Sequence, residues 1–464
     1  MKHGGSFLVV IAAASIAVGA CSSPAASPTA AQPTAAQPTA ARPTAAQPTA
    51  AQPTAAQPTA AQPTAAQPTA AQPTAAQPSS SGGLSVSSFD ASFSAMSQLT
   101  SVTAAGSGLV GVILPDTTTS ARYTSYDLPY LTQAFTAAGY KPTDFKIDNA
   151  AGTTTTELAI AQADITAGAK VLLVDPIDST TGNAIQAAAS AAGVTMISYD
   201  RATFQGTNTY YVSFDNVQVG ELIGQGFDKC LTSWNVASPK VFTVDGGQDT
   251  DPNAIDFAKG YNDAVWGQKV AQVAAGATNN GATLIGEQIA SKWDNATGGA
   301  VFQQAYTAHP EINATIEAND GLAGAVITVL KAAGVPKMTV PTTGQDATLQ
   351  GMEYVLQGWQ CGSVYKPIYL EAQAAVALAT YLRASQTPPS GLLNGQTTDP
   401  TPGSTTTEPA VLLTPYWVDS TNMASTVIKD NFVDANKLCA DVGADVCSAA
   451  GITPSGSPAP SATP

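Results

Sequence analysis

The chain is poor in histidine and in charge. Only His3 and His309 occur among 464 residues, which leaves almost no room for a histidine metal site or a Ser-His-Asp triad. Charged residues make up 11% of the sequence, and 33 acidic against 18 basic residues give a net charge of −15. That excess of negative charge argues against nucleic acid or anionic lipid as a partner.

Long hydrophobic runs are also missing. The longest, Phe7 to Ala20, is too short to span a bilayer but has the length of a signal-peptide core. It ends in Val-Gly-Ala-Cys21, which resembles a bacterial lipobox, where the cysteine thiol accepts a diacylglyceryl group. An ordinary signal peptide containing a cysteine is the alternative. We favour residues 1–21 as a lipoprotein signal peptide, with membrane contact only through lipid on Cys21.

Residues 22–85 lack the means to build a core. From Ala30 to Pro78 the pentapeptide Ala-Ala-Gln-Pro-Thr repeats without any aromatic or branched aliphatic residue. A proline at every fifth position favours extended polyproline-like chain over helix. We expect a disordered tether that lifts a domain off the membrane, although a repeat of no special length fits equally well. Residues 452–464 are expected to be a disordered tail.

The five cysteines divide into one and four. With Cys21 assigned to lipid, Cys230, Cys361, Cys439 and Cys447 form an even set in an exported chain, as expected for two disulfides. Three pairings are possible. We favour a local Cys439–Cys447 bond and a long-range Cys230–Cys361 bond. No cysteine or histidine spacing typical of a metal site occurs.

Between Leu109 and Gly451, short β-rich runs alternate with alanine-rich segments that end in Gly139, Gly168 or Gly193, a common helix stop. Apolar strands between helices predict parallel sheets covered on both faces. The pattern restarts after residue 239, so we expect an α/β protein with two doubly wound lobes. The expected strands are 109–114, 170–174, 194–198, 240–244, 282–285, 314–317 and 338–340.

Polar residues follow these strands directly. Ligands of such sheets bind at the carboxyl ends of the strands, so two lobes can present these residues across one cleft. The set comprises Asp116, Asp175, Asp200, Arg201, Asp245, Asn319, Asp320 and Asp346.

Several motifs, in this order and spacing, resemble the periplasmic sugar-binding proteins of type I fold, with the D-xylose-binding group as the best match. The resemblance covers Leu109 to about Ile428. The motifs are Ser120-Ala-Arg-Tyr123, Ser198-Tyr-Asp-Arg201, Tyr211-Val-Ser-Phe-Asp-Asn216 with Val219-Gly-Glu221, Ala318-Asn-Asp320, Gly344-Gln-Asp-Ala347 and Val364-Tyr-Lys-Pro367. The resemblance implies an N-terminal lobe of residues 107–235 plus 362–412, a C-terminal lobe of 236–361 plus 413–451, and a multi-strand hinge.

The resemblance also implies a sugar site. Hydroxyls donate and accept, so their site needs carboxylates, cationic donors and amides, while Trp293 would stack on the ring. The implied ligand-binding residues are Asp116, Arg122, Tyr123, Asp200, Arg201, Asp251, Asn253, Trp293, Asn319, Asp320, Asp346 and Lys366.

Other readings stay open for some of these residues. Trp293 fits an ordinary core position, Asp200 and Arg201 fit a structural ion pair, and Lys366 fits a hinge contact. Asp249, which is outside this set, fits a solvated loop.

Two further segments carry expectations of their own. Asp215-Asn216 reads as a turn and helix N-cap rather than a ligand contact. The Thr-, Pro- and Gly-rich insertion from Pro388 to Pro409 reads as a surface loop.

The expected function is capture of a monosaccharide, D-xylose first, by a monomer that delivers it to the permease and ATPase of an ABC importer. No cofactor or metal is expected, and no catalysis. The expected location is the outer side of the cell membrane, on a high-GC Gram-positive surface. Alternatives are another aldose (glucose, galactose or arabinose) or a sugar-sensing subunit. A glycosidase would need two carboxylates flanking one bond, but here carboxylates alternate with cations. Lactose-repressor-type regulators share the fold but carry a basic DNA-binding head, which this exported chain lacks.

Overall fold

The computed structural model describes residues 84–205 and 209–454. These residues belong to one compact unit, residues 77–464. The predicted signal peptide, Cys21, most of the tether and the tail from residue 455 lie outside the described residues.

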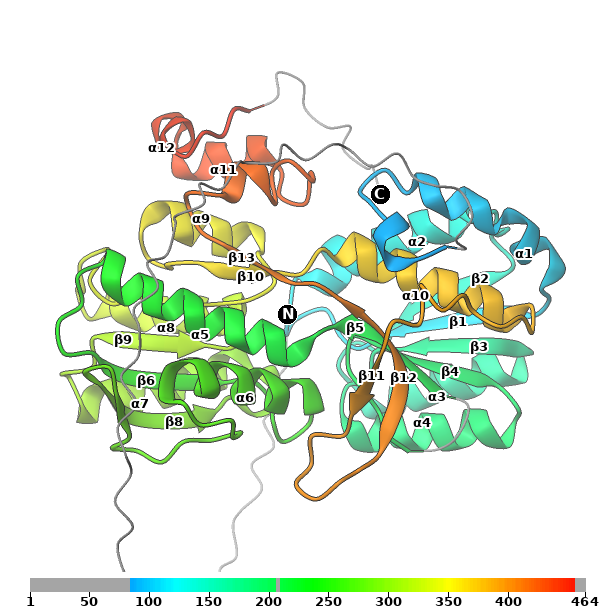
Figure 1. The fold of residues 1–464 in the computed structure, drawn as a ribbon, viewed down its shortest axis with the longest axis horizontal. Helices are drawn as coiled ribbons and strands as arrows, with labels where there is room; N and C mark the ends of the chain where they lie inside the picture. The colour runs from blue at the N-terminus through cyan, green and yellow to red at the C-terminus, as the bar shows by residue number, and fades with distance from the viewer. Residues whose placement is uncertain (1–83, 206–208, 455–464) are drawn as a thin grey trace, which may run out of the picture. The chain divides into compact units, whose positions relative to one another are not determined.

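The N-terminal lobe is built on a seven-stranded sheet in the order β11-β12-β5-β4-β3-β1-β2, parallel except for the β11–β12 pair. Helices α2 (Leu128–Ala137) and α10 (Ile368–Arg383) cover one face, and α3 (Thr154–Thr166) and α4 (Ser179–Ala191) cover the other (Figure 1). The strands are β1 (Leu109–Leu114), β2 (Phe145–Asn149), β3 (Ala169–Val174), β4 (Thr195–Tyr199), β5 (Thr209–Phe214), β11 (Gly395–Thr398) and β12 (Thr407–Leu413).

The C-terminal lobe has a four-stranded sheet in the order β7-β8-β6-β9, whose three longer strands are parallel. Helices α5 and α6 pack together, as do α7 and α8. The strands are β6 (Lys240–Asp245), β7 (Thr278–Asn279), β8 (Ala282–Ile289) and β9 (Ala314–Glu317). The helices are α5 (Asn216–Ser233), α6 (Pro252–Trp266), α7 (Asn295–Ala308), α8 (Asp320–Ala332), α9 (Leu349–Gln357), α11 (Ala435–Val442) and α12 (Ala444–Ala449).

These two lobes confirm the predicted doubly wound α/β architecture. The helix stops are also confirmed, because Gly139, Gly168 and Gly193 all have positive φ, which glycine adopts without strain. The N-cap prediction is confirmed as well, since Asp215 accepts a hydrogen bond from the Gln218 amide at 3.1 Å.

The predicted lobe boundary at residue 235 is wrong. Helix α5 packs closely on α6. A Cβ at Gly220 would lie 2.0 Å from the Phe257 carbonyl oxygen, so the close approach depends on glycine at this position. The chain therefore enters the C-terminal lobe at Asp215–Asn216, one helix earlier than expected. It returns through β10 (Ser363–Tyr365), which pairs antiparallel with β13 (Tyr416–Val418), so the described chain passes between the lobes three times.

The predicted strand at 338–340 is also wrong. Met338 has a left-handed backbone and is 55% exposed. The chain runs beside β9 only afterwards, where Thr315 N–H donates to the Pro341 carbonyl at 3.0 Å. Further along, Glu317 N–H donates to the Thr343 hydroxyl rather than to a carbonyl, so a side chain interrupts the strand ladder.

The insertion 388–409 is more than the predicted surface loop. It contains β11 and the start of β12, an antiparallel hairpin that extends the N-terminal sheet, and Leu392 within it is fully buried. At the hairpin tip, Lys259 of α6 donates to the Pro400 carbonyl at 3.1 Å. Threonine-rich chain favours strand when a sheet edge is available for pairing.

Both ends of the folded part extend further than predicted. Leu84, expected in the tether, is buried, and Val86 N–H donates to the Gly391 carbonyl. Helix α1 (Thr100–Ala105) contacts α10. Ile452, expected in the tail, is 2% exposed. Isolated apolar residues in polar chain carry too weak a pattern to reveal this packing.

Both favoured disulfides are present, Cys230–Cys361 and Cys439–Cys447. The first joins the last turns of α5 to the segment just before β10. Because α5 lies in the C-terminal lobe, both cysteines of this bond belong to that lobe, whereas the expected lobe bounds placed Cys230 in the N-terminal lobe.

Candidate functional site

A cavity of about 20 Å³ lies between the lobes, where residues after β1, β4, β6, β8 and β9 meet the crossing segment after β10. Ten of the twelve predicted ligand-binding residues line it. Sequence reasoning missed four others, which no charge pattern marks: Thr119, Ser120, Phe257 and Gln345. The predicted ten are Arg122, Tyr123, Asp200, Arg201, Asp251, Asn253, Trp293, Asn319, Asp346 and Lys366.

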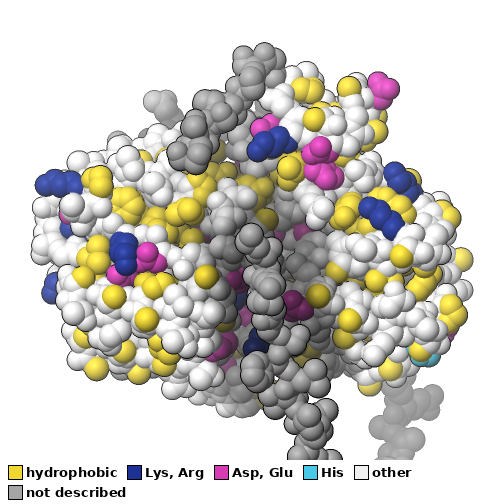
Figure 2. All heavy atoms as spheres, turned by 180° about the vertical axis from the view of Figure 1, so that it is seen from behind, with side chains coloured by type: hydrophobic (Ala, Val, Ile, Leu, Met, Phe, Trp, Pro, Cys, Tyr) yellow, Lys and Arg dark blue, Asp and Glu magenta, His cyan; other side chains and the backbone are white. Residues whose placement is uncertain are grey.

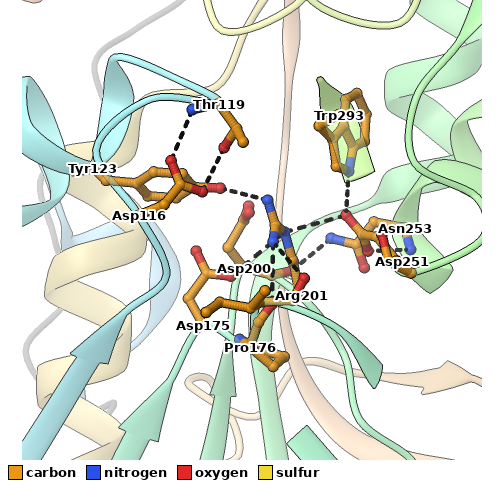
Figure 3. Close-up of polar contacts among 12 residues, drawn as sticks. Asp116, Thr119, Tyr123, Asp175, Pro176, Asp200, Arg201, Asp251, Asn253 and Trp293 are labelled. Carbon is orange, nitrogen blue, oxygen red and sulfur yellow. Dashed lines mark hydrogen bonds and ion pairs between the residues drawn. The ribbon is translucent and has the colours of Figure 1, made fainter. Parts of the chain in front are cut away.

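Arg201 is the centre of the contacts drawn in Figure 3. Its Nη2 donates to the Tyr123 hydroxyl at 2.9 Å, and its Nε lies 3.3 Å from Asp251 Oδ2 on the opposite lobe. Its Nη1 donates to the Pro176 carbonyl at 3.1 Å. The buried Asp175 carboxylate lies behind it, 3.7 Å from Nε. These contacts orient the guanidinium between the lobes.

Asp200 lies among three cationic side chains. Its Oδ1 lies 2.5 Å from Arg122 Nη1 and 3.5 Å from Lys366 Nζ. Burial opposes its ionisation, but Arg122, Lys366 and Arg201 outweigh burial and lower the pKa of Asp200 to about 2. Asp200 is therefore an ionised, acceptor-only group at neutral pH.

Lys366 bridges Asp200 and Asp346, with Nζ 3.3 Å from Asp346 Oδ1. Burial by itself would lower the pKa of Lys366, yet the two carboxylates raise it, so the ammonium stays charged. The Ser120 hydroxyl donates to the other Asp346 oxygen at 3.2 Å. Lys366 thus lines the cavity and also pairs with one carboxylate from each lobe.

Trp293 is held by one hydrogen bond and by an aromatic contact. Its indole N–H donates to Asp251 Oδ2 at 3.0 Å (Figure 3), and its ring contacts Phe257 edge-on with centroids 6.2 Å apart. A Cβ at Gly246 would lie 2.2 Å from the indole, so only glycine leaves room for the ring there. Trp293 is 5% exposed and still lines the cavity, so it is more than a core residue.

Asn253 and Asn319 hold loop ends as well as lining the cavity. Asn253 Nδ2 donates across the lobes to the Asp200 carbonyl at 2.6 Å, and its Oδ1 accepts from the Tyr211 hydroxyl. Asn319 Oδ1 caps α8 by accepting from Leu322 N–H at 2.9 Å.

Two predicted ligand residues, Asp116 and Asp320, do not line the cavity. Asp116 accepts from the amides of Thr118 and Thr119 at 2.7 Å each and from the Thr119 hydroxyl at 2.6 Å. Asp320 accepts from Gln360, Ser363 and Thr348. Carboxylates at strand ends satisfy free backbone amides there, and this use is indistinguishable in sequence from ligand binding.

Asp249 is exposed, yet its carboxylate accepts a hydrogen bond from the Ser291 hydroxyl at 2.5 Å. It does not line the cavity and supports the loop that carries Trp293.

The backbone at the cavity is strained. Asp200, Trp293 and Asp346 have φ of 58°, 60° and 89°, a region that costs non-glycine residues free energy. Tight packing is needed to hold such residues, and they cluster at functional sites.

No group of three His, Cys, Asp or Glu side chains within 84–205 and 209–454 is arranged to hold a metal ion. No helix in the same ranges is long and apolar enough to cross a bilayer. On the face drawn in Figure 2, basic side chains are isolated rather than gathered into a patch.

Comparison with known proteins agrees with this geometry. The model of the periplasmic binding protein domain matches residues 110–386, more than half of the chain. The D-xylose-binding periplasmic protein of Escherichia coli K12 is 30% identical over 296 residues, covering 63% of this chain and 82% of the relative. A multiple sugar-binding periplasmic protein of Azospirillum brasilense is 30% identical over 334 residues, covering 70% and 89%.

Among solved structures, a carbohydrate transporter solute binding protein from Chloroflexus aurantiacus in complex with D-glucose superposes with a TM-score of 0.59 at 24% identity. The match covers 71% of this chain and 98% of that one, and at this identity it shows the fold. The fold, the interlobe cavity and the matched domain together place this chain in the periplasmic binding protein family, with its two-lobed type I architecture.

Proposed function

We propose that this protein captures a monosaccharide in the cavity between its lobes and delivers it to an ABC sugar importer. D-xylose is the favoured sugar. One observation carries the proposal. Cationic, anionic, amide and aromatic side chains from both lobes surround one cavity, and Gln345 Oε1 within it is buried without a hydrogen-bond partner in the described part of the chain. A sugar hydroxyl supplies the donor that this oxygen lacks.

The side chains match the chemistry of a pyranose. Asp200 accepts only, Arg122, Arg201 and Lys366 donate only, and amides do both, as a ring of hydroxyls requires. Trp293 offers a flat surface to the C–H face of the ring. Charge-assisted hydrogen bonds in a dry site are the strong kind.

The small volume implies a cycle of opening and closing. A cavity of about 20 Å³ holds about one water molecule, so a sugar enters only when the lobes separate. Opening breaks the Arg201–Asp251 pair and the Asn253–Asp200 contact, and closure around sugar replaces such pairs by contacts to hydroxyls. The sugar stabilises closure by binding both lobes at once.

The choice of D-xylose rests on the Escherichia coli relative, which is named for that sugar. The Azospirillum relative is named for several sugars and the Chloroflexus structure holds D-glucose, which keeps other aldoses as the alternative. A sugar-sensing subunit of a signalling system would use the same cavity. Neighbouring permease and ATPase genes favour transport, and a neighbouring histidine kinase favours sensing.

A thermal-shift screen of the purified protein against about twenty monosaccharides, followed by calorimetry, tests the proposal, because a ligand of the native state raises the melting temperature. We expect one or a few aldoses, D-xylose among them, to stabilise the protein. A melting temperature that no monosaccharide raises would overturn the proposed function. Hydrolysis of aryl glycosides would favour a glycosidase instead.

The lipid anchor is a separate proposal, since Cys21 lies outside the described residues. Cys21→Ser should move the protein from the membrane fraction to the medium. Retention of the variant in the membrane would contradict lipid attachment at this cysteine.

A further inference from the structure

Two buried acidic side chains accept hydrogen bonds from Arg122 and do not line the cavity. Asp127 follows Arg122 by five residues, just before α2, and Glu371 lies in the first turn of α10. Both are 0% exposed, and neither lines the cavity. The sequence motifs marked neither residue, and the sugar contacts proposed above do not use them.

The hydrogen bonds of Arg122 account for most of its donors. Nε donates to Asp127 Oδ2 at 2.9 Å, and Nη2 donates to Asp127 Oδ1 at 2.8 Å and to Glu371 Oε2 at 2.7 Å. Nη1 donates to Asp200 Oδ1 at 2.5 Å. A guanidinium has five N–H groups in a rigid fork. Three are therefore held from behind, one is held by Asp200, and one on Nη1 remains for a ligand.

We infer that Glu371, together with Asp127, is a positioning residue of the sugar site, which fixes the plane of the Arg122 guanidinium so that Nη1 faces Asp200 and the cavity. The inference rests on the proposed function. Asp127 is itself held, because Tyr199 donates to its Oδ1 at 2.6 Å. Glu371 Oε1 has no hydrogen-bond partner among the described residues, so Arg122 is the one group that the Glu371 side chain bonds there.

The protonation state of Glu371 also affects Arg122. The titratable groups that face it come from several elements: Arg122 and Asp127 before α2, Tyr199 and Asp200 at β4, Tyr211 on β5, and Lys366 at the crossing. Burial raises the pKa of Glu371 to about 8, opposed by Arg122. Near pH 7 the side chain is mainly protonated. At pH 9 it carries a negative charge against Nη2, which draws the guanidinium back and weakens Nη1 as a donor to sugar.

The test uses the full chain and calorimetric affinity for D-xylose and D-glucose at pH 6.5, 7.5 and 9. The wild type should lose affinity between pH 7.5 and 9. Glu371→Gln has nearly the shape of glutamate but cannot ionise, so the affinity of this variant for sugar should stay nearly constant over that range. Glu371→Ala should weaken binding at least about tenfold at pH 6.5, because Arg122 loses its rear support.

Glu317→Gln is the matched control. Glu317 is fully buried in β9, and burial raises its pKa to about 8 as well, but it accepts from Thr343 N–H and does not contact Arg122. This variant should keep the pH profile of the wild type.

The outcomes separate the two claims. A folded Glu371→Ala that binds sugar like the wild type, or a Glu371→Gln that retains the full loss of affinity at pH 9, overturns the positioning role alone. A folded wild type that binds no monosaccharide overturns the proposed function and this inference with it. Circular dichroism and melting temperature establish that each variant is folded.

Discussion

The guanidinium of Arg201 and the carboxylate of Asp251 pair across the two lobes, with Nε 3.3 Å from Oδ2. The same oxygen accepts the indole N–H of Trp293. A residue after β4 of one lobe is thereby connected to the aromatic side chain after β8 of the other. An unpaired buried charge is destabilising. Separation of the lobes must therefore rehydrate this pair or exchange its partners.

Trp293→Ala should weaken sugar affinity about tenfold or more while the protein stays folded. The variant loses the flat ring, whose burial contributes on the order of 2 kcal/mol, and leaves Asp251 Oδ2 without its indole donor. Calorimetry measures the affinity. Trp234→Ala, at the end of α5 and away from the cavity, is the matched control and should bind like the wild type. Unchanged affinity in Trp293→Ala would refute the stacking role.

Asp346→Asn and Asp320→Asn should have different effects on binding. Asp346 lines the cavity and lies 3.3 Å from Lys366 Nζ, so its loss should weaken sugar binding about tenfold. Asp320 makes its hydrogen bonds to Gln360, Ser363 and Thr348, so its variant should lower the melting temperature but keep affinity within about twofold. Equal losses of affinity in both would restore Asp320 as a ligand residue.

The free energy of unfolding should fall as the pH rises from about 5 to 8. Burial raises the pKa values of Glu157, Glu317 and Glu371 to about 8. Between their ordinary pKa of 4.5 and 8, the native state holds protons that the unfolded state has released, so stability is greatest at the acidic end of this range. Asp200 acts oppositely, but only as the pH falls below about 4, since its pKa is lowered to about 2.

Melting curves between pH 5.5 and 8.5 measure this effect. We expect a melting temperature lower by about 5 °C or more at pH 8.5. Glu317→Gln should flatten the curve, because it removes one of the buried carboxyl groups whose pKa is raised. A melting temperature that rises over this range would be inconsistent with protonated glutamates in the native core.

Loss of the Cys230–Cys361 disulfide should lower stability with little effect on binding. The bond closes a loop of sequence separation 131, for which chain entropy predicts about 4 to 5 kcal/mol. Both cysteines belong to the C-terminal lobe, so the bond does not connect the moving parts. Cys230→Ser with Cys361→Ser should keep sugar affinity within about threefold and lower the melting temperature.

The paired substitution Cys439→Ser with Cys447→Ser is the control. That bond has a sequence separation of 8, so its loss should cost about half as much stability. A large change of sugar affinity on removing Cys230–Cys361 would instead mean that the bond takes part in closure. Peptide mapping of the unreduced protein checks both pairings.

Much of the architecture could be predicted because it depends on local patterns. The run Leu109–Leu114 is the strand β1 as expected, since continuous apolar residues bounded by polar ones describe a strand buried on both faces. Asp215 caps α5 because Asp satisfies free amides wherever a helix begins. Motif order and spacing also predicted the family and ten of the residues that surround the cavity.

Tertiary structure alone decided how those residues are used. Asp116 and Asp200 both follow strands, yet the first bonds its own loop and the second faces three cations, because that choice depends on which groups the fold brings near. Glu371 lies about 250 residues from Arg122 in the chain and carries no local signal, and the contact exists only because α10 packs behind the first lobe's cavity residues. Periodicity and motif spacing report what each segment can form, whereas ion pairs, strain and burial arise only when distant segments meet.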